Sequence, residues 1–313
     1  MLILRLSILT CVVALAGCSR TAASSPRSGG ASAASDFGTL GSCDAGHGLK
    51  TIDPTARLVV LVHGCNASQG RFVALAELFE LHGYQTLCFR YDDRQRLGGV
   101  ARQLHRALRE VARQRDQTDL TVLGHSQGGL VARAALAADQ AAIPTRRGPL
   151  AIFLVTVSAP FNGISAAAHC GAPWLHAVTL GSTLAVCRAI AGPKWRDIHP
   201  ASQLVMRPGQ LSPMVASHLE IRTDERNSCR TRAADGRCER ADYVFSVLEQ
   251  RNLKVDADLR VTPEVVAAGH AEIVGSDDAP PRKLLSVLQR HRVLSATPEH
   301  KLAALEALWQ RLF

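Results

Sequence analysis

The stretch 120–130 constrains the fold of this chain most, because a strand, a tight turn and a helix are predicted there in direct succession. The apolar run before the turn is typical of a strand, and residues 130–138 favour a helix. Between them, Gly124-His-Ser-Gln-Gly128 follows the pattern G-x-S-x-G. A serine at such a turn takes a strained backbone conformation, and the glycines avoid collisions with the strand and the helix. The turn makes Ser126 a candidate functional residue.

Apolar runs and segments of helical spacing alternate after residue 57. The predicted strands lie at 58–62, 85–90, 120–123, 150–157, 218–222 and 259–266. The predicted helices lie at 72–82, 100–114, 130–138, 281–290 and 298–313. This order predicts an α/β fold with a mostly parallel central sheet and helices on both faces. Residues 162–213 interrupt the alternation with Pro, Gly and short apolar patches, and we expect a helical cap insertion there, over the edge that carries the site.

The N-terminus predicts export from the cytoplasm. Arg5 precedes an apolar run at 6–16 that is too short to span a bilayer as a helix. The ending Leu15-Ala-Gly-Cys18 resembles the lipobox of bacterial lipoproteins. That resemblance implies cleavage before Cys18 and diacylation of its sulfur. Ser19, in place of the aspartate associated with inner-membrane retention, favours the outer membrane, facing the periplasm or the exterior.

These signals divide the chain into a signal peptide at 1–17, a flexible tether rich in Ser, Ala and Gly at 18–35, and one domain at 36–313. An apolar fraction of 47% in 313 residues suits a globular domain. The formal charge of +9 comes mainly from scattered arginines, which indicates a solvated basic surface, with attraction to anionic lipid as a second possibility. Aromatic residues make up 4% of the chain, so stacking platforms for nucleic acid are not expected.

The cysteines beyond Cys18 predict disulfides, because an exported chain meets an oxidising compartment. Cys229 and Cys238 flank a short polar loop and form the preferred pair. Cys170 with Cys187 is the next candidate. The remaining three leave one thiol over and are Cys43, Cys65 and Cys88. Since C-x-x-C spacing is absent, neither a zinc site nor another metal or cofactor is expected.

A serine hydroxyl needs a base within hydrogen-bond reach, and the base needs a carboxylate to orient it. On a parallel sheet, such groups follow the carboxyl ends of strands, here in the order serine, acid, histidine. His270 follows the last predicted strand and precedes a helix, and it is the histidine that meets this requirement well. It is therefore the candidate base.

The acid is less sharply defined, because many acidic residues lie between the strand at 218–222 and His270. They are Asp224, Glu225, Asp235, Glu239, Asp242, Glu249, Asp256 and Asp258. We prefer Asp242, because Asp242-Tyr-Val244 looks like the D-x-V turn on which related hydrolases carry their acid. Asp224, which follows the strand most directly, is the alternative.

Several stretches, in this order along the chain, resemble the α/β-hydrolase superfamily, close to bacterial lipases and esterases. They are Val59-Val-Leu-Val-His-Gly64, Gly124-His-Ser-Gln-Gly-Gly129, Ser158-Ala-Pro-Phe-Asn-Gly163, Pro200-Ala-Ser202, Asp242-Tyr-Val244 and Gly269-His270. The resemblance implies the α/β-hydrolase fold and hydrolysis of carboxylic esters through an acyl-enzyme, with no metal. It also assigns the backbone N–H of Cys65 to the oxyanion hole and makes His63 a packing residue. The N–H of Gln127, which follows the nucleophile, is the second oxyanion donor.

The chain departs from the family pattern at Cys65, at Asn162, where related lipases often have a histidine, and in the cysteine-flanked loop before Asp242. We expect a lipase or esterase type serine hydrolase whose partners are a hydrophobic acyl ester and, through its anchor, a membrane. Acyl transfer or thioester cleavage by the same three residues is the enzymatic alternative. A lipid-anchored binding protein that keeps the fold without turnover is the non-enzymatic one.

Overall fold

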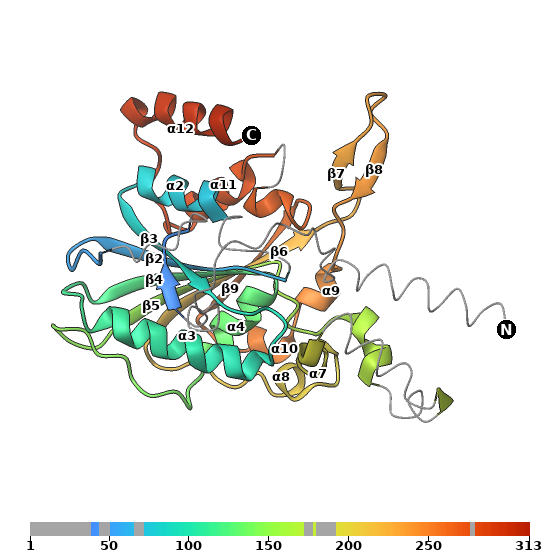
Figure 1. Cartoon of the computed structure of the whole chain (residues 1–313), viewed down its shortest axis with the longest axis horizontal. Helices are drawn as coiled ribbons and strands as arrows, with labels where there is room; N and C mark the ends of the chain where they lie inside the picture. Colours follow the sequence, from blue (N-terminus) through green and yellow to red (C-terminus); the bar gives the residue numbers. More distant parts are fainter. Residues whose placement is uncertain (1–38, 44–50, 66–71, 172–177, 180–191, 276–278) are drawn as a thin grey trace, which may run out of the picture.

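A seven-stranded sheet forms the centre of the computed structural model (Figure 1), in the order β1-β3-β2-β4-β5-β6-β9. Its strands are β1 (Thr39–Gly41), β2 (Arg57–Val62), β3 (Tyr84–Arg90), β4 (Asp119–His125), β5 (Ala151–Val157), β6 (Val215–Asp224) and β9 (Val261–Ala267). Neighbouring strands from β3 to β9 are parallel, and β1 pairs antiparallel with β3. The predicted mostly parallel sheet is confirmed, and β1 is an additional edge strand.

The structure describes residues 39–43, 51–65, 72–171, 178–179, 192–275 and 279–313. The predicted signal peptide, Cys18 and the whole tether lie outside this part of the chain, as do 172–177 and 180–191 of the expected cap. Within the described residues, no helix is both long and apolar enough to cross a membrane.

Helices cover both faces of the sheet (Figure 1), because alternate strand residues point to opposite sides. Leu58 and Val60 of β2 pack with α3 (Leu97–Ala112) and α4 (Gln127–Ala135), in one core cluster. Val59 of β2 lies in a second cluster with residues of the helices on the other face. Those helices are α2 (Val73–Leu81), α11 (Arg282–Arg290) and α12 (Glu299–Leu312).

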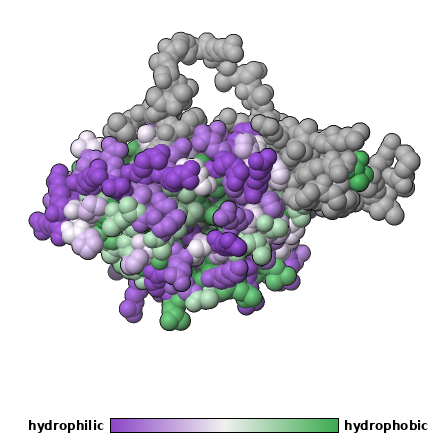
Figure 2. Space-filling model, turned by 90° about the horizontal axis from the view of Figure 1, so that it is seen from below, coloured by the Kyte–Doolittle hydropathy of each residue, from purple (hydrophilic) through white to green (hydrophobic). Residues whose placement is uncertain are grey.

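The described parts of the expected cap contain only short helical turns. They are η2 (Ser165–Gly171), η3 (Gly192–Lys194), α7 (Trp195–Ile198) and α8 (Gln203–Met206). After β6, the chain forms a separate hairpin of β7 (Cys229–Arg232) and β8 (Cys238–Ala241), which projects away from the sheet (Figure 1). The remaining short elements are α9 (Val247–Gln250), α10 (Leu253–Asp256) and η4 (Glu272–Val274). The face seen in Figure 2 is dominated by hydrophilic residues, with apolar ones in small groups.

Disulfides tie down both the sheet edge and the hairpin. Cys229 and Cys238 are bonded across the hairpin, as predicted. Cys43 is bonded to Cys88, which links the segment after β1 to β3. Cys65 is also disulfide-bonded, so it is not the leftover thiol. The expected Cys170–Cys187 pair lies outside the described side chains.

Candidate active site

Ser126 lies at a sharp turn between β4 and α4. Its backbone has φ 56° and ψ −126°, which is rare for a residue other than glycine. Its N–H donates to the carbonyl of Val157 at 2.8 Å, which ties the turn to the end of β5. A Cβ atom on Gly124 would lie 2.5 Å from the carbonyl oxygen of Gly128, and one on Gly128 would overlap the carbonyl of Val62. Close packing therefore requires both glycines, as the motif predicts.

The loop after β2 passes directly beside Ser126. A Cβ atom on Gly64 would lie 2.8 Å from Ser126 Cβ and 3.3 Å from Ser126 Oγ. Cys65, whose N–H is a predicted oxyanion donor, is the next residue in this loop. The loop therefore brings its backbone close to Ser126, as the predicted role of Cys65 requires.

His63 fixes this loop by packing, as expected. Its ring stacks on Tyr91 with centroids 4.3 Å apart, and its Nδ1–H donates to the carbonyl of Gly64 at 2.9 Å. The hydroxyl of Tyr91 donates to the carbonyl of His63 at 2.5 Å. Burial lowers the pKa of His63 and raises that of Tyr91 well above its usual range, so both side chains are neutral near pH 7.

Gln127 is the first residue of α4, where a helix leaves its N–H groups without intrahelical acceptors. Its side-chain Nε2 donates to the carbonyl of Asp93 at 2.9 Å. The carboxylate of Asp93 in turn lies 3.6 Å from Nζ of the fully buried Lys194, which also donates to Cys65 Sγ at 2.9 Å. Burial lowers the pKa of Lys194, and Asp93 opposes that shift. The two predicted oxyanion residues are thus linked through Asp93 and Lys194, neither of which was predicted from the sequence.

His270 lies just beyond β9, as predicted, and is buried. Its Nδ1–H donates to Glu225 Oε1 at 2.8 Å, since a carboxylate has no hydrogen to donate. The ring of Phe245 packs edge-on against His270, with centroids 4.9 Å apart. On the other side, Nε2–H of His125, the residue before Ser126, donates to the carbonyl of His270 at 2.9 Å. These contacts join the histidine loop to the serine turn.

Both carboxylate oxygens of Glu225 accept hydrogen bonds from protein groups. Besides His270, its Oε1 accepts from the hydroxyl of Thr223 at 2.9 Å. Its Oε2 accepts from the N–H groups of Val244 at 2.5 Å and Phe245 at 2.8 Å. Ser158 extends this set, because its hydroxyl lies 2.7 Å from that of Thr223. So many donors compensate the loss of water around the carboxylate, whose side chain is 0% exposed.

The two acids favoured from the sequence lie elsewhere. Asp242 is buried, but its carboxylate bonds to Arg230 and to the N–H groups of Ala271 and Glu272, and not to the ring of His270. Asp224 pairs with Arg226 at the surface. Glu225 follows Asp224 directly, so its side chain takes the opposite side of the extended backbone and faces His270. The D-x-V resemblance favoured Asp242, whereas the carboxylate that contacts the ring of His270 comes from Glu225, the residue straight after β6.

Among the hydrogen bonds of the described residues, none joins Ser126 Oγ to the ring of His270. Such contacts are often long in the absence of substrate. No group of three or more His, Cys, Asp or Glu side chains suited to a metal ion is found in the described parts of the chain. What the arrangement offers chemically is a serine in a strained turn, a nearby loop at Gly64, and a buried histidine whose Nδ1 contacts a buried carboxylate.

Residues 53–190 match the protein family described as "Putative serine esterase (DUF676)". The matched part runs from the segment before β2 past β5, so it includes Gly64 and Ser126 but neither Glu225 nor His270. No curated protein matches the chain.

Solved structures of low sequence identity are similar to this chain. The lipase BlEst2 of Bacillus licheniformis in its propeptide form has a TM-score of 0.50 at 15% identity, covering 83% of this chain and 54% of that one. Its mature form has a TM-score of 0.48 at 15% identity, over 82% of this chain and 98% of that one. A metagenomic carboxyl esterase, MGS0156, has a TM-score of 0.49 at 16% identity, over 77% and 76%. The chain has the α/β-hydrolase fold.

Proposed function

We propose that this chain is a serine hydrolase of carboxylic esters, with Ser126 as nucleophile, His270 as base and Glu225 as the orienting acid. The observation that carries the proposal is the 2.8 Å contact between His270 Nδ1 and Glu225 Oε1, at the same edge of the sheet as the strained Ser126. Glu225 takes the role that the sequence analysis gave to Asp242. The match to a serine esterase family supports the reaction class.

In this mechanism, His270 Nε2 removes the proton from Ser126 Oγ as the oxygen attacks the ester carbonyl. The N–H groups of Cys65 and Gln127 hold the oxyanion of the tetrahedral intermediate. His270 then gives its proton to the leaving alcohol, and the acyl group stays on Ser126. A water molecule, activated by His270 in the same way, releases the acid. Glu225 holds Nδ1 protonated throughout, so that Nε2 is the nitrogen that exchanges protons.

The substrate that we propose has a hydrophobic acyl group. Phe245 borders His270, and exposed apolar side chains precede and follow it in the chain: Tyr243 is 50% exposed, Val244 41% and Leu248 70%. Apolar side chains exposed beside a reactive centre suit an acyl chain better than a polar substrate. A lipid anchor at Cys18, which remains a proposal from the sequence, would hold the enzyme at the outer membrane.

A fluorophosphonate probe and p-nitrophenyl esters test the proposal together. The wild-type protein should react with the probe and hydrolyse the esters, and Ser126→Ala should lose labelling and lower kcat by about 10⁴-fold or more. Hydrolysis that survives in Ser126→Ala would contradict the assignment. A wild-type protein that neither reacts nor turns over would indicate a binding protein. Product analysis with alcohol acceptors and thioester substrates separates hydrolysis from acyl transfer and thioester cleavage.

A further inference from the structure

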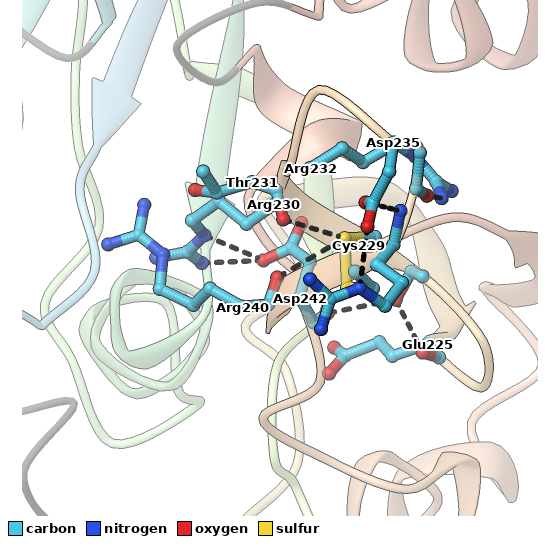
Figure 3. Close-up of a disulfide and its surroundings, with 12 residues drawn as sticks. Glu225, Cys229, Arg230, Thr231, Arg232, Asp235, Arg240 and Asp242 are labelled. Atoms are coloured by element: carbon cyan, nitrogen blue, oxygen red, sulfur yellow. Dashed lines mark hydrogen bonds and ion pairs between the residues drawn. A yellow bond between two sulfur atoms is a disulfide. The ribbon is translucent and has the colours of Figure 1, made fainter.

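One arginine of the hairpin β7–β8, Arg230, forms an ion pair with Asp242, a residue next to the candidate site. Figure 3 shows its disulfide, Cys229–Cys238, with Arg230 directed at Asp242. The guanidinium of Arg230 donates to Asp242 Oδ1 through Nε at 3.0 Å and through Nη2 at 2.5 Å. The Arg230 side chain is 22% exposed and that of Asp242 is 1% exposed, so the pair is largely shielded from water. Because water screens it poorly, the attraction between the two charges is strong, and removing one charge would leave the other buried without a partner.

Asp242 holds the backbone on both sides of the His270 Cα atom. Its Oδ2 accepts from the N–H groups of Ala271 and Glu272, each at 2.9 Å. Its carbonyl accepts from the N–H of His270 at 3.0 Å. The loop also passes so close that a Cβ atom on Gly269 would overlap the Asp242 carboxylate. Asp242 thus fixes where the loop places His270, while Glu225 fixes the ring itself.

Both ends of the hairpin are fastened to the same small region. Ser228, just before β7, donates its hydroxyl to the carbonyl of Glu225 at 2.5 Å and to that of Asp242 at 3.1 Å. Asp242 follows β8 directly, and its N–H donates to the carbonyl of Ser228 at 3.2 Å. The disulfide closes the hairpin next to this junction. The carboxylate that orients His270 and the one that holds its backbone are therefore joined by the base of one cross-linked hairpin.

We propose that Arg230 and Asp242 are positioning residues for His270, and that the hairpin holds both of them in place. They set the distance over which the histidine exchanges protons with Ser126. This inference rests on the proposed function. Neither residue contacts the reacting atoms. Their effect comes from geometry, since a displacement of a catalytic group by about 1 Å can lower a rate by about a hundredfold.

Asp242→Asn tests the positioning role, because the amide keeps the size of the carboxylate and one acceptor oxygen but loses the ion pair with Arg230. We expect kcat for a soluble p-nitrophenyl ester to fall about tenfold to a hundredfold, with KM within about twofold of wild type. A change confined to general stability would not lower kcat of the folded enzyme. Thermal unfolding of each variant identifies an assay temperature at which all are folded.

Arg230→Met breaks the same pair from the other side, but it leaves a buried carboxylate without its cation and is expected to fold less well. The double variant Asp242→Asn, Arg230→Met removes both charges and avoids that problem. Because the two residues act through one contact, the double variant should lose no more kcat than Asp242→Asn does. Losses that multiply would overturn the shared role.

Arg237→Met is the matched control. Arg237 belongs to the same hairpin but pairs with Asp235 at its exposed tip, so removing its charge should leave kcat unchanged. An equal loss of kcat in this control would overturn the proposal, as would wild-type kcat in folded Asp242→Asn. Failure of the proposed function looks different, because ester hydrolysis would then persist in Ser126→Ala or be absent from the wild-type protein. If Asp242→Asn lost about 10⁴-fold and Glu225→Gln little, Asp242 would be the orienting acid and the positioning role would be overturned.

Discussion

The two halves of the candidate site are built in different ways. The serine half consists of Ser126 at its strained turn and the loop at Gly64, which come from the adjacent strands β4 and β2. The acid–base half consists of Glu225, Asp242 and His270, which come from three separate segments around the hairpin. The serine half is held by close backbone packing, whereas the acid–base half is held by hydrogen bonds between buried charged and polar groups. A short sequence pattern can encode the first arrangement but not the second.

The largest expected loss of kcat comes from changing Glu225, and the same kind of change at its neighbour Asp224 should have almost no effect. Glu225→Gln keeps the shape of the side chain but removes the charge that stabilises protonated His270, so kcat should fall by about 10³–10⁴-fold. Asp224→Asn, one residue earlier and paired with Arg226 at the surface, should stay within about twofold of wild type. Steady-state kinetics on the two variants decide between them. Equal losses of kcat in the two variants would contradict the assignment of Glu225, and not Asp224, as the acid that orients His270.

Gly128→Ala tests whether packing governs the serine half. The added methyl group would overlap the carbonyl of Val62 in the neighbouring strand, so the turn must shift or the sheet must open. We expect a loss of unfolding free energy of about 3 kcal/mol, measured by urea denaturation. Gly83→Ala is a contrasting variant, because its added methyl group meets no atom within 4 Å and only its positive φ opposes the change. A Gly128→Ala protein as stable as Gly83→Ala would contradict the packing argument.

Lys194→Met asks whether the serine half also depends on a buried charge. Loss of the ammonium releases Asp93 and the sulfur of Cys65, so the oxyanion loop should become less well placed. Removing an entire oxyanion donor lowers kcat by about 10²–10³-fold, and a displaced donor should lower it about tenfold. Lys301→Met is the control, since Lys301 donates to the carbonyl of Leu81, outside the site. Similar kcat values for the two variants would mean that the serine half is held in place by packing alone and does not depend on the charge of Lys194.

Thr223→Val gives the smallest expected effect in the acid–base half. It removes one of four donors to Glu225 and leaves Ser158 without that partner. Because the other three donors remain, kcat should fall only about threefold, while the unfolding free energy falls by about 1–3 kcal/mol. Kinetics and denaturation on the same preparation check both values. A loss of kcat as large as that of Glu225→Gln would mean that Thr223 takes part in orienting the acid.

The alternation of apolar and amphipathic segments was enough to predict the parallel sheet and the helices on both faces. The G-x-S-x-G pattern and the order of strands predicted the positions of Ser126 and His270. The Cys229–Cys238 bond and the packing role of His63 were also predicted. These features depend on local sequence patterns or on the order of strands, and both can be recognised in the sequence. The hairpin strands β7 and β8 and the edge strand β1 were not anticipated, because short polar strands carry little periodicity.

The fold class, the serine turn and the histidine that follows the last strand can all be predicted from the sequence, because each depends on residues that are close in the chain or on the order of elements. Which carboxylate faces His270 could be seen only once the folded arrangement was known. Glu225 and Asp242 both follow strand residues and both are buried, and their roles differ only in the donors that surround them. Those donors come from segments far apart in the sequence. No local pattern can therefore predict which carboxylate bonds to the His270 ring and which bonds to the backbone beside it.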